Sequence, residues 1–483
     1  MSKKIKLLIL FCIICQFANG QNGSRKEDQK IIISGYIADS CLKNFSDSPE
    51  IYFYDQYNET PYNRSLVIPI SIKNNRFVAT IKNEGRVGYF RIKDLPILGI
   101  YQNFFLIESG DSLSLNILTM KDMCFTGKGS EKMNYQLWIG KQWFQNFKSF
   151  NSINDTARIY YDKQRMLKMM STSLDSLDFL RKKVGDDVYR LLKYNTLSAI
   201  KNECLTNSLS FIKTNDSVYR KALKKRINEL YHEQSTFVTA DTFIVKNSFI
   251  YSKYLFNLNK YYVALTANSI KPSFGSVYNF INEHFSGMLR DRLMLNCFVY
   301  MMREKGVSDY IFPALNTVKD DSSKEGIELI AKSRIPGAKA YNFSLEGIDG
   351  KYVKLEDFKG KVVLMDSWFE GCINCTVLSK QLAPVIDYFK NNQKVVFLGV
   401  NVDRKKEKFI EGVNSGQYTS DQTISVYTNG LGERHPMLEY YQYDGYPNLL
   451  LINKEGVIIS ANPPRPINKE RTEQLIKLIN ENL

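Results

Sequence analysis

The sequence predicts a multidomain protein with an N-terminal β-rich, sandwich-like domain, a central all-α region and a C-terminal α/β domain. Its 483 residues exceed what one core accommodates, because single cores stop growing at about 250–300 residues. The hydrophobic pattern also changes twice, near residues 129 and 335. A hydrophobic content of 44% and a charged content of 24% are typical of globular chains, so each region can bury a core.

Residues 1–20 have the pattern of a cleaved secretory signal peptide. Three lysines precede the apolar run 7–14, and small residues at 18–20 offer a cleavage site. The run is too short to span a bilayer, and a lipoprotein site at Cys15 is disfavoured because Ile14 is not small. A buried N-terminal helix is the alternative. We therefore expect a periplasmic or otherwise extracytoplasmic protein, with 21–128 as its first mature domain.

The formal net charge is +15, and three of these charges leave with the signal. A basic chain can bind nucleic acid or anionic lipid. Export argues against nucleic acid, and the lysines are spread along the chain without an aromatic-interleaved motif. A solvated lysine-rich surface is the favoured interpretation, with weak attraction to an anionic membrane as the alternative.

Region 21–128 is predicted to be β-rich and to serve as a binding or spacer module. After a polar lead-in it contains short apolar runs separated by Gly, Asn, Asp and Pro, a spacing typical of sandwiches and barrels. The runs are 31–33, 51–54, 66–70, 77–81, 88–92 and 113–117.

Region 129–334 is predicted to be an irregular helical region. Apolar and aromatic residues recur three and four positions apart with charges between them, and aromatic residues at this spacing favour a core over a cofactor site. The clearest stretches are 160–193, 219–231, 254–264, 277–285 and 288–302.

Region 335–483 is predicted to be an α/β domain with a mixed sheet, following a Pro- and Gly-containing linker. Buried-strand patterns alternate with helical ones and end in a hairpin and a helix. In order, the pattern predicts strand 362–365, a helix with apolar residues between 378 and 389, strand 394–402, helix 404–413, strand 424–428, hairpin 449–460 and helix 469–479.

Cys372 and Cys375 carry the chemistry that the sequence predicts. The spacing places both at the start of a helix directly after a strand. Free N–H groups and the partial positive charge at a helix N-terminus favour the thiolate, which is the nucleophile in disulfide exchange. Positions three apart share a helix face, so the second thiol can resolve a mixed disulfide. A zinc site is disfavoured and no metal is expected, because His435 is the only nearby histidine.

Four further cysteines remain after the signal is removed, and they do not form a disulfide scaffold. Cys41 with Cys124, and Cys204 with Cys297, are candidate structural bridges. Buried free thiols are an equally good interpretation.

Three motifs in order resemble the thioredoxin superfamily, most closely its TlpA/ResA-type branch of exported reductases. Residues 348–364 resemble the family's β-hairpin and first central strand, and 366–372 resemble its approach to the active site. Residues 445–451 resemble its cis-proline loop and following strand. The match covers about residues 335–483, which implies a thioredoxin-like fold there.

The resemblance implies that Cys372 is the attacking thiol, that Cys375 is the resolving thiol, and that the pair forms a redox-active disulfide. Asp366 occupies the position of a buried carboxylate that helps to move the proton of the second cysteine. The pair 373–374 between the cysteines departs from the dipeptides familiar in the family. Because this pair tunes the redox potential, the direction and strength of the reaction stay open.

The resemblance also places Pro447, Tyr446 and Trp368 at the substrate side of the site. Pro447 is expected to be cis and to face the cysteines, where the absence of an N–H leaves the chain open for substrate pairing. Trp368 is expected to pack beside the motif. Glu370 would raise the thiol pKa if it lay close and partly buried, although an exposed side chain is the simpler interpretation.

These observations predict an extracytoplasmic thiol–disulfide oxidoreductase that acts on protein thiols or disulfides, in the reducing direction. We expect a membrane-linked reductant as partner and no cofactor, while the oligomeric state stays open. The alternative is a binding or scaffold protein whose dithiol is idle, since roughly two-thirds of the mature chain lies outside the redox fold. A thiol peroxidase is disfavoured, because residues 368–371 lack the Pro and Thr which that chemistry requires.

Overall fold

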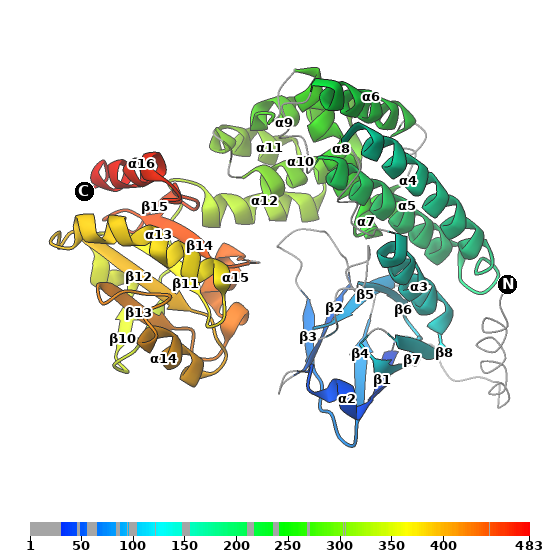
Figure 1. Ribbon diagram of the computed structural model, residues 1–483, viewed down its shortest axis with the longest axis horizontal. Coiled ribbons are helices and arrows are strands. Elements are labelled where there is room, and N and C mark those ends of the chain that lie inside the picture. The colour runs from blue at the N-terminus through cyan, green and yellow to red at the C-terminus, as the bar shows by residue number, and fades with distance from the viewer. Residues whose placement is uncertain are drawn as a thin grey trace. The chain divides into compact units, whose positions relative to one another are not determined.

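The computed structural model of the protein describes most of the chain from residue 30 onward (Figure 1). The predicted signal peptide lies outside the described residues. By their contacts the residues divide into two compact units. The described ranges are 30–45, 49–55, 65–83, 87–93, 95, 104–120, 122–146, 155–209, 217–234, 241–267, 271–302, 304, 306–443 and 445–483.

The first unit contains two four-stranded sheets that enclose one hydrophobic core. The strand orders are β4-β1-β7-β8 and β3-β2-β5-β6. β1 and β4 alternate buried and exposed residues, as expected for strands with one face on a core. The elements are β1 (Lys30–Ile37), α2 (Asp39–Leu42), β2 (Glu50–Tyr54), β3 (Leu66–Pro69), β4 (Arg76–Lys82), β5 (Val87–Ile92), β6 (Phe105–Glu108), β7 (Ser112–Thr119), β8 (Asp122–Lys128) and α3 (Ser130–Asn146).

Helix α3 belongs to this β-rich unit, although its sequence period groups it with the helical region. Met133 and Leu137 lie in the core of the two sheets. Lys132 is 2% exposed and forms ion pairs with Asp111 at 2.7 Å and Glu108 at 3.0 Å. Apolar burial and a buried ion pair therefore fix the first turns of α3 to the sheets.

The second unit begins with a bundle of helices. The predicted stretch 160–193 is two helices, because a turn at 179–185 interrupts it. Among the described residues, every helix is too short or too polar to cross a membrane. The helices are α4 (Asp155–Asp178), α5 (Asp186–Leu209), α6 (Ser217–Glu233), α7 (Thr242–Asn247), α8 (Tyr251–Thr266), α9 (Phe274–His284), α10 (Gly287–Met301), α11 (Ile311–Thr317) and α12 (Asp321–Arg334).

The C-terminal part of this unit is an α/β domain built on a seven-stranded mixed sheet. The strand order is β10-β9-β13-β12-β11-β14-β15, with β11, β12 and β13 parallel. The elements are β9 (Ser344–Gly347), β10 (Tyr352–Lys354), β11 (Val362–Trp368), α13 (Ile373–Phe389), β12 (Val395–Asn401), α14 (Lys406–Asn414), β13 (Thr423–Tyr427), α15 (Pro436–Tyr441), β14 (Asn448–Ile452), β15 (Ile458–Ser460) and α16 (Lys469–Asn480).

Helices cover both faces of this sheet, and β11 lies at its centre. Val362 and Leu364 of β11 pack in one core with α13 and α16, whereas Val363 and Met365 face a second core that includes α15. Every residue of β11 is buried. A central strand covered on both faces requires a continuous apolar run, which is the pattern that predicts this strand from the sequence.

Candidate functional site

The two cysteines lie where β11 ends and α13 begins. Cys372 is the N-cap of α13, and its Sγ accepts a hydrogen bond from the N–H of Cys375 at 3.2 Å. The two side chains form a disulfide, with their Cα atoms 5.2 Å apart. The predicted placement at a helix N-terminus is therefore confirmed. A side chain at the N-cap accepts hydrogen bonds from free N–H groups and lies at the positive end of the helix dipole. The same position therefore stabilises a Cys372 thiolate after reduction.

Asp366 is buried in the middle of β11, with a side chain that is 8% exposed. Burial raises the pKa of this carboxyl well above the usual range of aspartate, while the Arg465 guanidinium and the Ser367 backbone N–H oppose the rise. Its Oδ1 has no hydrogen-bond partner among the described residues. The carboxyl therefore retains its proton at pH values at which an exposed aspartate is ionised.

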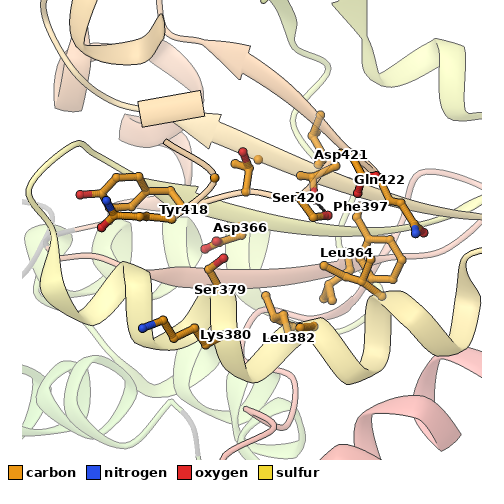
Figure 2. A pocket seen from close by; sticks show the side chains of 18 of the residues that line it. Leu364, Asp366, Ser379, Lys380, Leu382, Phe397, Tyr418, Ser420, Asp421 and Gln422 are labelled. Carbon is orange, nitrogen blue, oxygen red and sulfur yellow. Dashed lines mark hydrogen bonds between the residues drawn. The ribbon is translucent and has the colours of Figure 1, made fainter. Parts of the chain in front are cut away.

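Asp366 lines a cavity of about 540 Å³ between α13, the strands β11 and β12, and the segment 416–423 (Figure 2). Leu364, Leu382 and Phe397 supply apolar walls. Ser379, one helical turn beyond Cys375 on α13, also lines it. Positions four apart share a helix face, so the cavity lies on the side of α13 that carries Cys375.

Trp368, the last residue of β11, joins the cysteines in a buried aromatic cluster. Its side chain is fully buried and stacks on Tyr418, with ring centroids 5.0 Å apart and an interplanar angle of 6°. Phe409 of α14 stacks on Tyr427 of β13 in the same cluster. The predicted packing of Trp368 beside the motif is confirmed. Its predicted contact with substrate stays a prediction, and the indole is fully buried in this structure.

The loop that precedes β14 brings Tyr446 and Pro447 to the site. The Tyr446–Pro447 peptide bond is cis, as predicted. Pro447 is buried, and its carbonyl accepts a hydrogen bond from Arg465 Nη2 at 2.7 Å. Tyr446 is partly buried, packs on the cluster that contains both cysteines, and contacts Phe369 edge to face. The structure thus joins the loop to the cysteine cluster through Tyr446.

Two residues that the sequence motifs did not indicate hold the loop before Cys372. Asp403 Oδ2 accepts a hydrogen bond from the N–H of Glu370 at 2.8 Å, and the Tyr418 hydroxyl accepts one from the N–H of Gly371 at 2.8 Å. The Glu370 carboxylate forms an ion pair with Lys408 at 3.2 Å and is partly exposed. No spacing in the sequence relates these residues to the cysteines, because Asp403 follows β12 and Tyr418 follows α14.

The remaining cysteines in the described residues do not form disulfides. Cys41, Cys204 and Cys297 are buried, and Cys124 is exposed. Burial raises the pKa values of Cys204 and Cys297, so both are poor nucleophiles. Neither candidate bridge is formed in this structure. Within the same residues, no three His, Cys, Asp or Glu side chains gather closely enough to hold a metal ion.

Residues 360–458 match the family model described as thioredoxin-like. The thiol-disulfide oxidoreductase ResA of Bacillus subtilis is 30% identical over 125 residues, which are 26% of this chain and 65% of that protein. The thioredoxin-like protein YneN of the same organism is 26% identical over 141 residues, which are 29% of this chain and 78% of that protein.

A solved structure of a thiol:disulfide interchange protein from a Bacteroides species is 26% identical to this chain, with a TM-score of 0.27. The match covers 31% of this chain and 92% of the chain in that structure. The chain spans slightly less than two-thirds of the length of ResA, and the family model matches within the last third of the chain. Sequence order, sheet topology and the family match agree that the C-terminal part of this chain is a thioredoxin-like domain.

Proposed function

We propose that the protein is an extracytoplasmic thiol–disulfide oxidoreductase that exchanges disulfides through Cys372 and Cys375. The observation that carries the proposal is the position of Cys372 Sγ as N-cap acceptor, with Cys375 one turn further along the same helix. This arrangement lets one sulfur attack and the other resolve. The name of the matching relative ResA, a thiol-disulfide oxidoreductase, supports the same chemistry.

The reaction in the reducing direction needs only these two thiols and a proton acceptor. The Cys372 thiolate attacks a substrate disulfide, forms a mixed disulfide and releases one substrate thiolate. Cys375 then loses its proton, attacks Cys372 Sγ and releases the second substrate thiolate, so two electrons pass to the substrate. We assign the acceptance of the Cys375 proton to the ionised form of Asp366, because its raised pKa makes this carboxylate a stronger base than an exposed one. An electron donor, which we expect to be membrane-linked, must then reduce the new disulfide.

The charges around the pair favour the reducing direction. Asp403 accepts a hydrogen bond from the Glu370 N–H and so brings a carboxylate to the loop that precedes Cys372, while the Glu370 carboxylate is paired with Lys408. Carboxylates disfavour a neighbouring thiolate, and a dithiol whose reduced form is less stable gives up electrons more readily. The proposed location rests on the secretory pattern of residues 1–20.

A trapping experiment with the full chain tests the assignment. Cys375→Ser should accumulate a mixed disulfide at Cys372 when the reduced protein meets an oxidised protein such as insulin, because nothing resolves the intermediate. Cys372→Ser should form none and should lose insulin reduction. Cys124→Ser is the matched control, because it removes an exposed thiol far along the chain from the motif and should behave as the parent. Equal trapping by Cys372→Ser would overturn the assignment of the nucleophile.

The potential of the pair tests the direction and separates the enzyme from a scaffold with an idle dithiol. Equilibration of the parent with glutathione buffers should place the pair at a potential as low as that of thioredoxin, about −270 mV. A potential near that of a strong oxidant, about −120 mV, would contradict the reducing direction. A parent protein that neither reduces insulin nor is trapped would favour the scaffold.

A further inference from the structure

The loop from Phe369 to Gly371 joins β11 to α13 and determines where Cys372 lies. It is short, and Gly371 has φ +89°, a conformation that residues with a Cβ rarely adopt. The Phe369 carbonyl accepts a hydrogen bond from the Cys372 N–H at 3.3 Å, which closes a tight turn. The N–H groups of Glu370 and Gly371, which lie inside this turn, donate hydrogen bonds to side chains from outside the loop.

Asp403 receives the first of these N–H groups and is itself held in place. The Asn401 side-chain amide donates to Asp403 Oδ2 at 2.8 Å, and the Asp403 N–H donates to Asn401 Oδ1 at 3.0 Å. Asn401 is fully buried at the end of β12, where it pairs with Trp368 of β11. Asp403 is therefore a rigid acceptor, because reciprocal hydrogen bonds to a buried strand residue fix its carboxylate.

Tyr418 receives the second N–H group and is fixed by its ring. It is 7% exposed and stacks on the buried indole of Trp368. Figure 2 shows the same ring at the wall of the cavity that contains Asp366. The hydroxyl accepts the Gly371 N–H at 2.8 Å, so a side chain anchored in the core holds the residue directly before Cys372.

We propose that Asp403 and Tyr418 are positioning residues that hold the 369–371 loop so that Cys372 Sγ stays at the N-cap of α13. The proposal rests on the function proposed above. Thiolate stabilisation at this position depends on geometry, because the bond from the Cys375 N–H to Sγ is made at 3.2 Å and the field of the helix falls off within one turn. A loop released from either acceptor samples positions in which the sulfur loses that contact.

Tyr418→Phe is the sharpest test, because it keeps the ring that stacks on Trp368 and removes only the acceptor oxygen. We expect iodoacetamide to alkylate Cys372 about threefold more slowly at pH 7 in the reduced variant, with the midpoint of the pH profile moved upward. Tyr427→Phe is the matched control: this tyrosine lies in the same aromatic cluster, and its hydroxyl bonds to the backbone of Gly430 instead of the loop. The control should alkylate as the parent does.

Asp403→Ala and Asp403→Asn separate positioning from charge. Both remove the negative charge, but only the amide of asparagine keeps an oxygen that can accept the Glu370 N–H. We expect Cys372 in the alanine variant to be alkylated more slowly than in the asparagine variant, because the two variants share the loss of charge and only asparagine keeps an acceptor for the loop. Equal rates for the two variants would assign the effect of Asp403 to charge alone and would overturn its positioning role.

The outcomes distinguish this inference from the proposed function. A Tyr418→Phe variant whose alkylation profile coincides with those of the parent and of Tyr427→Phe overturns the positioning role of Tyr418, whatever the enzymatic activity. If the parent fails to reduce insulin, the proposed function fails, but the alkylation profile still reports on the position of Cys372. Circular dichroism of each variant identifies any general loss of folding, and hydrogen exchange of the 369–371 amides should rise only in Tyr418→Phe and Asp403→Ala.

Discussion

Gly412 in α14 lies against the indole of Trp368, and we expect a single added methyl group there to disturb the site. A Cβ placed on Gly412 would lie 2.5 Å from Cζ3 and 2.8 Å from Cη2 of Trp368, closer than real Cβ atoms approach other atoms. It would also lie 3.6 Å from Tyr418. Because Trp368 is fully buried and stacks on Tyr418, the indole cannot shift without disturbing that stack.

The expected magnitude for Gly412→Ala follows from two opposing effects. Overpacking a close-packed core costs about 1–3 kcal/mol. Alanine is more favourable than glycine inside a helix by about 0.5–1 kcal/mol, which offsets part of this cost. We therefore expect the thioredoxin-like domain to lose about 1 kcal/mol of unfolding free energy, or roughly a fivefold change in its folding equilibrium. If the strain reaches Tyr418, alkylation of Cys372 should slow as well.

Native-state hydrogen exchange of the most protected β11 amides measures this free energy in the full chain, since the chain as a whole need not unfold in one step. The double variant with Trp368→Phe is the decisive comparison, because phenylalanine lacks the two indole carbons that the new methyl group would meet. In that background Gly412→Ala should be neutral or stabilising. A cost that is unchanged by Trp368→Phe, or no cost in the parent background, would refute the proposed packing.

Two further substitutions probe buried charges. Asp366→Asn should gain stability relative to the parent as the pH rises. In the parent, the unfolded chain releases the Asp366 proton above about pH 4, whereas the folded protein still holds it because the folded pKa is raised. The parent therefore loses unfolding free energy as the pH rises toward the folded pKa, and the asparagine variant does not. Urea unfolding at pH 5 and pH 8 measures the difference, and parallel curves would contradict it. Lys132→Met should cost the β-rich unit about 3–5 kcal/mol by leaving the buried Asp111 without its counter-charge. Lys141→Met, whose ion pair is solvent-exposed, should cost less than about 1 kcal/mol in hydrogen exchange of β7.

The order of elements in the C-terminal domain could be predicted because each signal is local. The apolar run at 362–365 and the cysteine spacing place β11 and the start of α13, and both lie where the pattern predicts. In the β-rich unit, the predicted runs omit β6 and β8. Polar residues alternate with apolar ones in β8, a short pattern that resembles a loop, whereas β6 is a buried apolar run of only three residues followed by a glutamate. The sequence predicts one continuous helical stretch over 160–193, although Gly185 lies within it. In the structure a turn at 179–185 separates two helices.

The surroundings of Cys372 could be predicted only in part. Asp366 and Pro447 lie at positions that the resemblance indicates, and the structure places the first beside a cavity and the second in a loop next to the cysteine cluster. Asp403 and Tyr418 were not predicted, because hydrophobic period and motif spacing describe single elements. Their contacts arise from the pairing of strands and from the packing of a segment that follows α14.

The topology nevertheless explains why acceptors for the loop come from residues after β12. β11 and β12 are parallel neighbours in register, with Trp368 opposite Asn401, so both strands end at the same edge of the sheet. The loop that carries Cys372 leaves from that edge, and the residues just beyond Asn401 must pass beside it. A polar side chain there, such as Asp403, meets backbone N–H groups that would otherwise need water. In a domain with this strand order, groups that position the first cysteine are therefore to be sought in the residues that immediately follow the neighbouring parallel strand.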